Sequence, residues 1–300
     1  MPPDLFPPEA LLRDSAPPLS DYGWRLLAEG DSWFSITATG RYSPNLLAEL
    51  RLPRSAAIVN CAAPGHTLQR MVDRRADGHC ERLLHHRRLA RYWDAVLLSA
   101  GGNDLIVAAA TPLADDAGVP TPEAQRLLRT FEEVGHASAA ADWISEPGWA
   151  RLADHLRANL AAFVAWRDQG PSAGRPLLLH TYATPVARPS GAGLALQGWL
   201  YPVLLRYGVP AAWQQALTEL LFERLRRLLM GFDQASGGPD ATPGVHVFDS
   251  AGQVALLPAS PDDAGPSGDW INEIHLNASG YRKLGRAFGA WIGAVMARYP

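Results

Sequence analysis

The 300-residue sequence has few cysteines, a single lysine (Lys283) and no long apolar run. With only Cys61 and Cys80, it cannot build a disulfide framework or a zinc site of four cysteines. No window reaches the roughly 18 consecutive apolar residues of a membrane-spanning helix, so we expect no integral membrane segment. The net charge is -3 and charged residues make up 19% of the chain, which does not favour nucleic acid as a partner.

The N-terminal residues are rich in proline, with Pro-Pro pairs at 2–3, 7–8 and 17–18. They lack the basic region and apolar stretch of a signal peptide, so we expect a cytoplasmic protein. The proline pairs predict an extended N-terminal arm at residues 1–22. The remaining residues, 23–300, are long enough for a single α/β domain with insertions.

Five short runs rich in leucine, valine and isoleucine have the composition of buried parallel strands. They are Arg25–Glu29, Ala56–Asn60, Asp94–Ala100, Pro176–Thr181 and Val245–Asp249. Helical segments alternate with them, which predicts a doubly wound five-stranded parallel sheet in a three-layer αβα sandwich. Right-handed crossovers place the carboxyl ends of all these strands at one edge of the sheet, where ligands bind in such folds.

Two stretches exceed what the crossovers need, about 105–174 and 193–243, and we interpret them as helical insertions. Helices are expected from Ser43-Pro44 through Leu50 and over Cys80–Trp93, Pro122–Val134, Trp149–Arg167, Leu196–Tyr207 and Ala211–Phe232. The clearest periodic signal is a final helix with an apolar stripe of residues 281, 284, 288, 291 and 295. Asn277 or Ser279 can cap this helix.

Glycines and small polar residues follow three of the predicted strands. The first strand ends in Gly30-Asp31-Ser32, the second leads to Gly65, and the third leads to Asn103 within SAGGNDL. Such residues are ordinary turn formers and helix caps. They can also serve catalysis, because a nucleophilic serine needs a base and oxyanion donors close by. His275, on the loop before the last helix, is the candidate base.

This order, GDS, then a glycine, then GxND, then a late histidine, resembles the SGNH (GDSL-type) hydrolase superfamily across the whole α/β core. The resemblance implies that Ser32 attacks an ester or thioester carbonyl and that His275 is the base. It also implies an oxyanion hole made of the Ser32 N–H, the Gly65 N–H and the Asn103 side chain. Each motif alone is weak, but the four in this order form a specific combination.

One position departs from the family pattern. Three residues before the histidine, where the family usually has Asp, the sequence has Asn272. An amide oxygen can accept a hydrogen bond from the imidazole but adds no charge, and Asn in place of the acid can cost about 10⁴ in turnover. We take Asn272 as the positional equivalent and Asp269 as the reserve acid. Glu273 is a further local acid, and a backbone carbonyl could hold the imidazole instead, leaving a Ser-His dyad.

The resulting hypothesis is a serine esterase or lipase that acts on a small-molecule or acylated substrate through an acyl-enzyme intermediate. No HExxH or paired-ligand spacing indicates a metal, and no cofactor is expected. Two alternatives stay open: a weak or inactive ligand-binding protein of the same fold, which Asn272 would support, and an acyltransferase using the same site. The apolar segment Leu194–Gly208 could cover an acyl chain, although core packing is the favoured interpretation. The acyl group, the alcohol and the oligomeric state stay open.

Overall fold

The computed structural model describes residues 1–12, 15–35, 44–76, 78–192 and 197–299. Within these ranges, six strands form one parallel sheet in the order β1-β3-β2-β4-β5-β6. The strands are β1 (Asp4–Phe6), β2 (Trp24–Gly30), β3 (Ala56–Asn60), β4 (Ala95–Ser99), β5 (Leu177–His180) and β6 (Val245–Phe248). Residues of the central strands are almost completely buried, as expected for strands covered on both faces.

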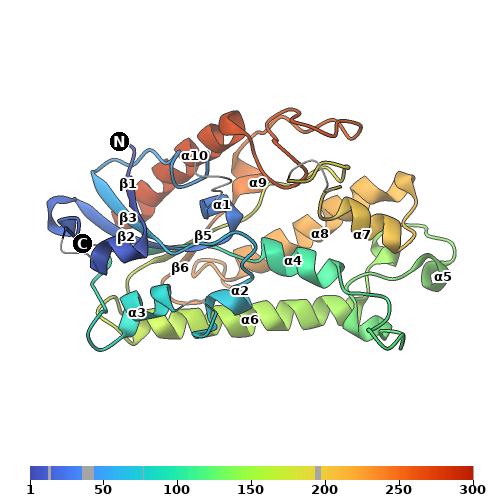
Figure 1. The fold of residues 1–300 in the computed structure, drawn as a ribbon, viewed down its shortest axis with the longest axis horizontal. Coiled ribbons are helices and arrows are strands. Elements are labelled where there is room, and N and C mark those ends of the chain that lie inside the picture. Colours follow the sequence, from blue (N-terminus) through green and yellow to red (C-terminus); the bar gives the residue numbers. More distant parts are fainter. Residues whose placement is uncertain (13–14, 36–43, 77, 193–196, 300) are drawn as a thin grey trace.

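Helices cover both faces of this sheet. Figure 1 shows α10 (Ala278–Met296) on one face and α3 (His79–His85) with α6 (Glu146–Asp168) on the other. The remaining helices are α1 (Ser32–Ser35), α2 (Leu68–Met71), α4 (Gly102–Ala109), α5 (Phe131–Val134), α7 (Tyr201–Arg206), α8 (Ala211–Gly231) and α9 (Ser250–Gln253). Short 3-10 helices are η1 (Pro8–Leu12), η2 (Leu19–Asp21), η3 (Glu123–Gln125) and η4 (Ala140–Trp143). The predicted doubly wound α/β fold is confirmed.

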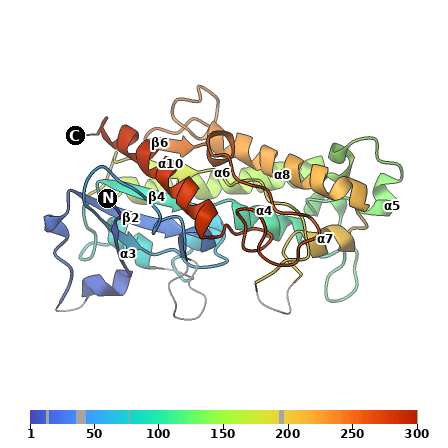
Figure 2. The same ribbon diagram turned by 90° about the horizontal axis from the view of Figure 1, so that it is seen from above.

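The two predicted insertions meet in space. Figures 1 and 2 both place α5, α7 and one end of α8 together at the same end of the molecule, beyond the sheet. The backbone of the two insertions is joined there, since Phe131 N donates to Tyr207 O at 3.0 Å. Among the described helices, none combines the length and apolar character needed to cross a membrane.

The predicted number of five strands is wrong, although all five predicted strands are present within two residues of their expected ends. The sixth strand, β1, lies in the proline-rich arm and pairs in parallel with β3, with Leu5 opposite Ile58. Met1 is also held, because its amino group donates to Leu52 O. Extended backbone was predictable from the prolines, but pairing depends on an open edge of β3 that appears only in the assembled sheet. The division at residues 22 and 23 stays a prediction.

Two helices expected near the N-terminus differ from the structure. The helix expected through Leu50 is a series of turns over its described residues, and Ser43 lies outside them. The helix expected over Cys80–Trp93 ends at His85. Its continuation is prevented because the chain folds back, so that Trp93 Nε1 donates to Leu83 O at 3.1 Å.

In the insertions, the long helices were predicted well and the short ones were not. The segments Trp149–Arg167 and Ala211–Phe232 correspond to α6 and α8, whereas Pro122–Val134 forms the separate elements η3 and α5. The helix expected over Leu196–Tyr207 is shortened to α7, and residues 193–196 lie outside the described part of the chain. Gly198 has a φ of +98°, which a right-handed helix cannot contain.

The final helix agrees with its predicted stripe and cap. Tyr281, Leu284 and Phe288 are fully buried, and Asn277 Oδ1 accepts from Ser279 N at 2.9 Å and from Gly280 N at 3.1 Å. The helix also uses glycines for close packing. A Cβ on Gly289 would lie 2.5 Å from Arg51 O, so the backbone of this neighbouring segment leaves no room for a side chain.

We therefore expect Gly289→Ala to lower the free energy of unfolding by about 1–3 kcal/mol, because a backbone oxygen must be displaced. Gly231→Ala, at the end of α8, is the matched control. Its new Cβ would meet nothing closer than Asp240 at 3.9 Å, so the better helix former should stabilise the protein by about 0.5–1 kcal/mol. Urea unfolding measures both, and effects of the same sign would contradict the packing described for α10.

Candidate active site

Ser32 and His275, which are far apart in the sequence, are joined by a hydrogen bond. Strand β2 ends at Gly30, which lies so close to Ser99 that a Cβ would come within 2.8 Å of the Ser99 Cβ. Ser32 is the first residue of the following helix, α1. Its Oγ lies 2.7 Å from His275 Nε2, and both side chains are buried at 8% exposure.

Asn272 fixes the orientation and the tautomer of this imidazole. Its Oδ1 lies 2.9 Å from the backbone N of His275, 3.2 Å from Ile274 N and 3.0 Å from His275 Nδ1. Because the two backbone groups can only donate, the oxygen of the amide must face them. The imidazole nitrogen that faces the same oxygen must then carry a proton. This leaves the lone pair of Nε2 pointing at the Ser32 hydroxyl, as a base for that hydroxyl requires.

The two acidic residues considered on this loop, Asp269 and Glu273, do not contact the imidazole. Asp269, expected as the reserve acid, accepts from Lys283 Nζ at 2.6 Å and from Leu257 N at 2.7 Å. It is paired with α10 instead, and that expectation is corrected. Glu273 is fully buried and is turned to the opposite side of the loop, since its carboxylate accepts from the backbone N–H groups of residues 199–201.

Asn103 lies on the same side of the sheet edge as Ser32. It stands in the first turn of α4, and its Nδ2 donates to His66 O at 3.0 Å, which leaves a second N–H on the same nitrogen. Asp104 holds the facing loop, because its carboxylate accepts from Leu68 N at 2.9 and 3.1 Å. Gly65 belongs to this loop, with a φ of +78° that favours glycine. It is exposed and does not line the cavity beside Ser32.

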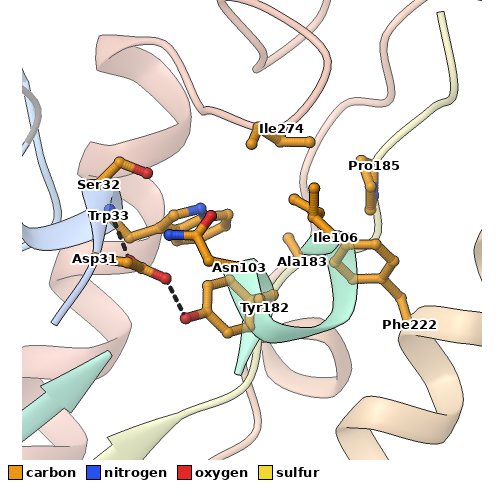
Figure 3. A pocket seen from close by; sticks show the side chains of 11 residues that line it. Asp31, Ser32, Trp33, Asn103, Ile106, Tyr182, Ala183, Pro185, Phe222 and Ile274 are labelled. Atoms are coloured by element: carbon orange, nitrogen blue, oxygen red, sulfur yellow. Dashed lines mark hydrogen bonds between the residues drawn. The ribbon is translucent and has the colours of Figure 1, made fainter. Parts of the chain in front are cut away.

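A buried cluster supports the backbone beneath Ser32. Asp31 accepts from Trp33 N at 3.0 Å and from the Tyr182 hydroxyl (Figure 3). It also accepts from Ser99 Oγ at 2.8 Å. His180 Nε2 lies 3.0 Å from the same Ser99 oxygen. The sequence pointed to Asp31 only as part of Gly30-Asp31-Ser32 and did not single out Ser99 or Tyr182. Both follow the strand-end rule that singled out Ser32, so that rule could have found them.

Burial disfavours charge in this cluster. His180 Nδ1 faces Thr181 O at 2.8 Å and therefore carries a hydrogen. Ser99 donates its one hydroxyl proton to Asp31 and also lies 3.0 Å from His180 Nε2. Burial raises the pKa of Asp31 to about 6 and lowers the pKa of His180 to about 4. Between these two pH values both residues are therefore neutral.

Trp199 covers the other side of the imidazole. Its ring meets the His275 ring edge to face, with 5.2 Å between centroids and an interplanar angle of 83°. Glu273 holds the segment that carries Trp199, and a Cβ on Gly198 would lie 2.5 Å from the Glu273 carboxylate. Trp199 belongs to the apolar segment 194–208, for which the sequence favoured core packing over a cover for an acyl chain. Next to it, Leu200 and Leu204 are fully buried, so this part of the segment packs in the core.

The site can therefore activate a hydroxyl without further ionisable groups. Burial lowers the pKa of His275 to about 4, so its imidazole is neutral above that value and able to accept a proton. Within the described ranges, no group of three or more histidine, cysteine, aspartate or glutamate side chains is placed to hold a metal ion. A hydroxyl group, an imidazole oriented to accept its proton and a side-chain amide meet at one edge of the sheet.

We expect the ring of His275 to titrate with a pKa of about 4 in an NMR pH titration. Asn272→Asp places a carboxylate beside Nδ1 and should raise this pKa toward its ordinary value of about 6.5, since opposite charge favours the imidazolium. Asn277→Asp, also on this loop, is the control: it keeps a good helix cap and should change the pKa much less. A wild-type pKa near 6.5 would show that burial does not control this imidazole.

The chain is similar to known proteins only in its overall structure. No protein-family model matches the chain, and no curated protein matches it. Among solved structures, it is similar to an extracellular lipase from Streptomyces rimosus (14% identity, 93% of this chain and 100% of that one, TM-score 0.46). It is also similar to phospholipase A1 from Streptomyces albidoflavus (14%, 92% and 99%, TM-score 0.43) and to the M. smegmatis aryl esterase (13%, 93% and 100%, TM-score 0.42).

Proposed function

We propose that this protein is a serine hydrolase of carboxylic esters, thioesters included, that forms an acyl-enzyme intermediate. The observation that carries the proposal is the continuous hydrogen-bond chain from Ser32 through His275 to Asn272, with 2.7 Å and 3.0 Å between the bonded atoms. Nucleophile, base and orienting group stand within the distances that such catalysis needs.

In the first half-reaction, Ser32 Oγ attacks the carbonyl carbon while its proton moves to His275 Nε2. The π electrons of the carbonyl move to its oxygen and give a tetrahedral oxyanion. The bond to the alcohol oxygen then breaks, and this oxygen keeps the electron pair and takes the proton from Nε2. The products are the acyl ester of Ser32 and the free alcohol.

The second half-reaction repeats these steps with water as the nucleophile. His275 takes a proton from water, the hydroxide oxygen attacks the acyl carbon, and a second tetrahedral oxyanion forms. Its collapse breaks the bond to Ser32 Oγ, which recovers the proton from Nε2. The carboxylic acid leaves and the free serine is restored.

Three donors would stabilise the oxyanion in both steps. The Ser32 N–H lies in the first turn of α1, where amides have no acceptor within the helix. The second N–H of Asn103 Nδ2 is left by the bond to His66. The Gly65 N–H belongs to the loop joined to Asn103 through His66 and is the third donor. Such preorganised donors are the largest contribution to many acyl transfers.

The proposal predicts covalent labelling of Ser32 by a small alkyl fluorophosphonate and hydrolysis of p-nitrophenyl acetate. Ser32→Ala should abolish both, as followed by intact-protein mass spectrometry and nitrophenolate release. Ser250→Ala is the matched control, because Ser250 is also buried and lies next to the end of a strand of the same sheet. Its labelling and turnover should equal those of the wild type.

Other outcomes would identify the alternative functions. Undiminished hydrolysis by Ser32→Ala would exclude Ser32 as the nucleophile. A wild-type protein that is neither labelled nor active on any ester, yet gains thermal stability from an acylated ligand, would be a binding protein. If an added alcohol is acylated in preference to water, product analysis would identify an acyltransferase.

We expect Asn103→Ala to lower kcat by about 10²–10³ with little change in KM, because the lost donor acts mainly on the oxyanion. Asn159→Ala is the matched control, since Asn159 Nδ2 also donates to a backbone carbonyl, that of His155, but on α6. Its kcat should be unchanged. If Asn103→Ala raises KM and leaves kcat unchanged, this amide binds the substrate in the ground state rather than the oxyanion.

A further inference from the structure

A small cavity lies beside Ser32 and Asn103, with polar side chains on one side and apolar ones on the other. Its walls come from five parts of the fold: the turn from β2 into α1, α4, the segment after β5, α8 and the loop that leads to His275 (Figure 3). The apolar side chains on these walls are Ile106, Ala183, Pro185, Phe222 and Ile274. The cavity has a volume of about 10 Å³, which is close to the minimum for a single water molecule.

The stereochemistry of the proposed reaction decides which part of an ester enters this cavity. A carbonyl carbon bonded to Ser32 Oγ carries three other groups: the oxyanion, the leaving oxygen and the acyl substituent. The leaving oxygen must face His275 Nε2 to receive its proton, and His275 does not line the cavity. The oxyanion must face the amide donors of Ser32 and Asn103, which line one side of the cavity, so it occupies that side (Figure 3). The acyl substituent is therefore the group that points between Ile106 and Phe222.

Displacing the side chains that form the walls of the cavity would cost free energy, because most of them are buried. Phe222, Ala183 and Ile274 are each buried to within 8% exposure, and Phe222 belongs to the buried face of α8. Protein interiors are packed as densely as organic crystals, so a longer acyl chain would have to displace side chains already in contact with the core. Among the apolar wall residues, Ile106 is only partly buried.

We propose that this cavity is the acyl pocket and that it restricts the enzyme to acetyl-sized acyl groups, with Ile106 and Phe222 as the residues that set the limit. The proposal rests on the proposed esterase function. A methyl group is similar in size to a water molecule and fits, whereas propionyl and butyryl groups do not. A difference of one methylene is worth about 10–200-fold in kcat/KM at such a pocket.

The test is a series of p-nitrophenyl esters from acetate to hexanoate. For the wild type, we expect kcat/KM to fall at least about tenfold between acetate and butyrate. Ile106→Ala opens the end of the cavity and should raise butyrate relative to acetate by a similar factor. Val107→Ala is the matched control, because the neighbouring Val107 is 59% exposed and lines a different groove. Its acyl preference should equal that of the wild type.

A second variant tests the same limit from the opposite direction. Ala183→Val fills the remaining space and should lower acetate turnover while labelling of Ser32 by the smallest phosphonate probe persists. Thermal unfolding of each variant confirms that the fold is retained.

The possible failures are distinguishable. If the wild type is labelled at Ser32 but hydrolyses hexanoate as fast as acetate, the acyl limit is wrong and the esterase assignment stands. If Ile106→Ala folds but keeps the wild-type preference, this side chain does not set the limit. If the wild type neither reacts with the probe nor hydrolyses any ester, the proposed function fails and this inference fails with it.

Discussion

The candidate site depends on one oxygen atom, Oδ1 of Asn272, which faces three nitrogen atoms of the same short turn. Two of these are the backbone N–H groups of Ile274 and His275. The amide therefore cannot rotate without leaving these buried groups unpaired. The third is Nδ1 of His275. Asn in place of Asp costs serine hydrolases activity partly because the amide can select the wrong tautomer. Here the backbone removes that freedom, so the loss is confined to the missing charge.

Two adjacent residues of the turn that carries His275 have different roles. Asn272 faces the imidazole, while Glu273 faces away and accepts from the N–H groups that begin α7. Anionic groups are favourable at this end of a helix. Through these bonds, Glu273 holds the chain next to Gly198, so that Trp199 meets the imidazole edge to face. The same short loop thus positions the base and the aromatic ring beside it.

The sequence predicted the parts of this arrangement that depend on local patterns. Apolar runs gave the strands, and the rule that parallel strands end at one edge brought Ser32, Asn103 and His275 together. What it missed depends on contacts between distant segments. Asp269 was a reasonable second acid by spacing, but Lys283, one turn into α10, pairs with it. Trp199 and Glu273 are neighbours in space because an insertion folds back over the site, which no periodicity within either segment records. The cavity likewise exists only where five separate parts of the chain meet.

Among the residues that the structure describes, an amide rather than a carboxylate faces His275 Nδ1, and this changes the energetics of the proposed reaction rather than its steps. With its pKa near 4, the neutral imidazole is a weak base, so it removes the Ser32 proton with less driving force. The imidazolium that results is correspondingly a strong acid, which favours protonation of the leaving alcohol. The barrier then lies mainly in forming the oxyanion, and the amide donors must supply most of the stabilisation. Such a site suits esters, whose carbonyl carbon is more electrophilic than that of an amide. A tight acyl cavity adds to this, because it holds a small acyl group in one orientation toward those donors.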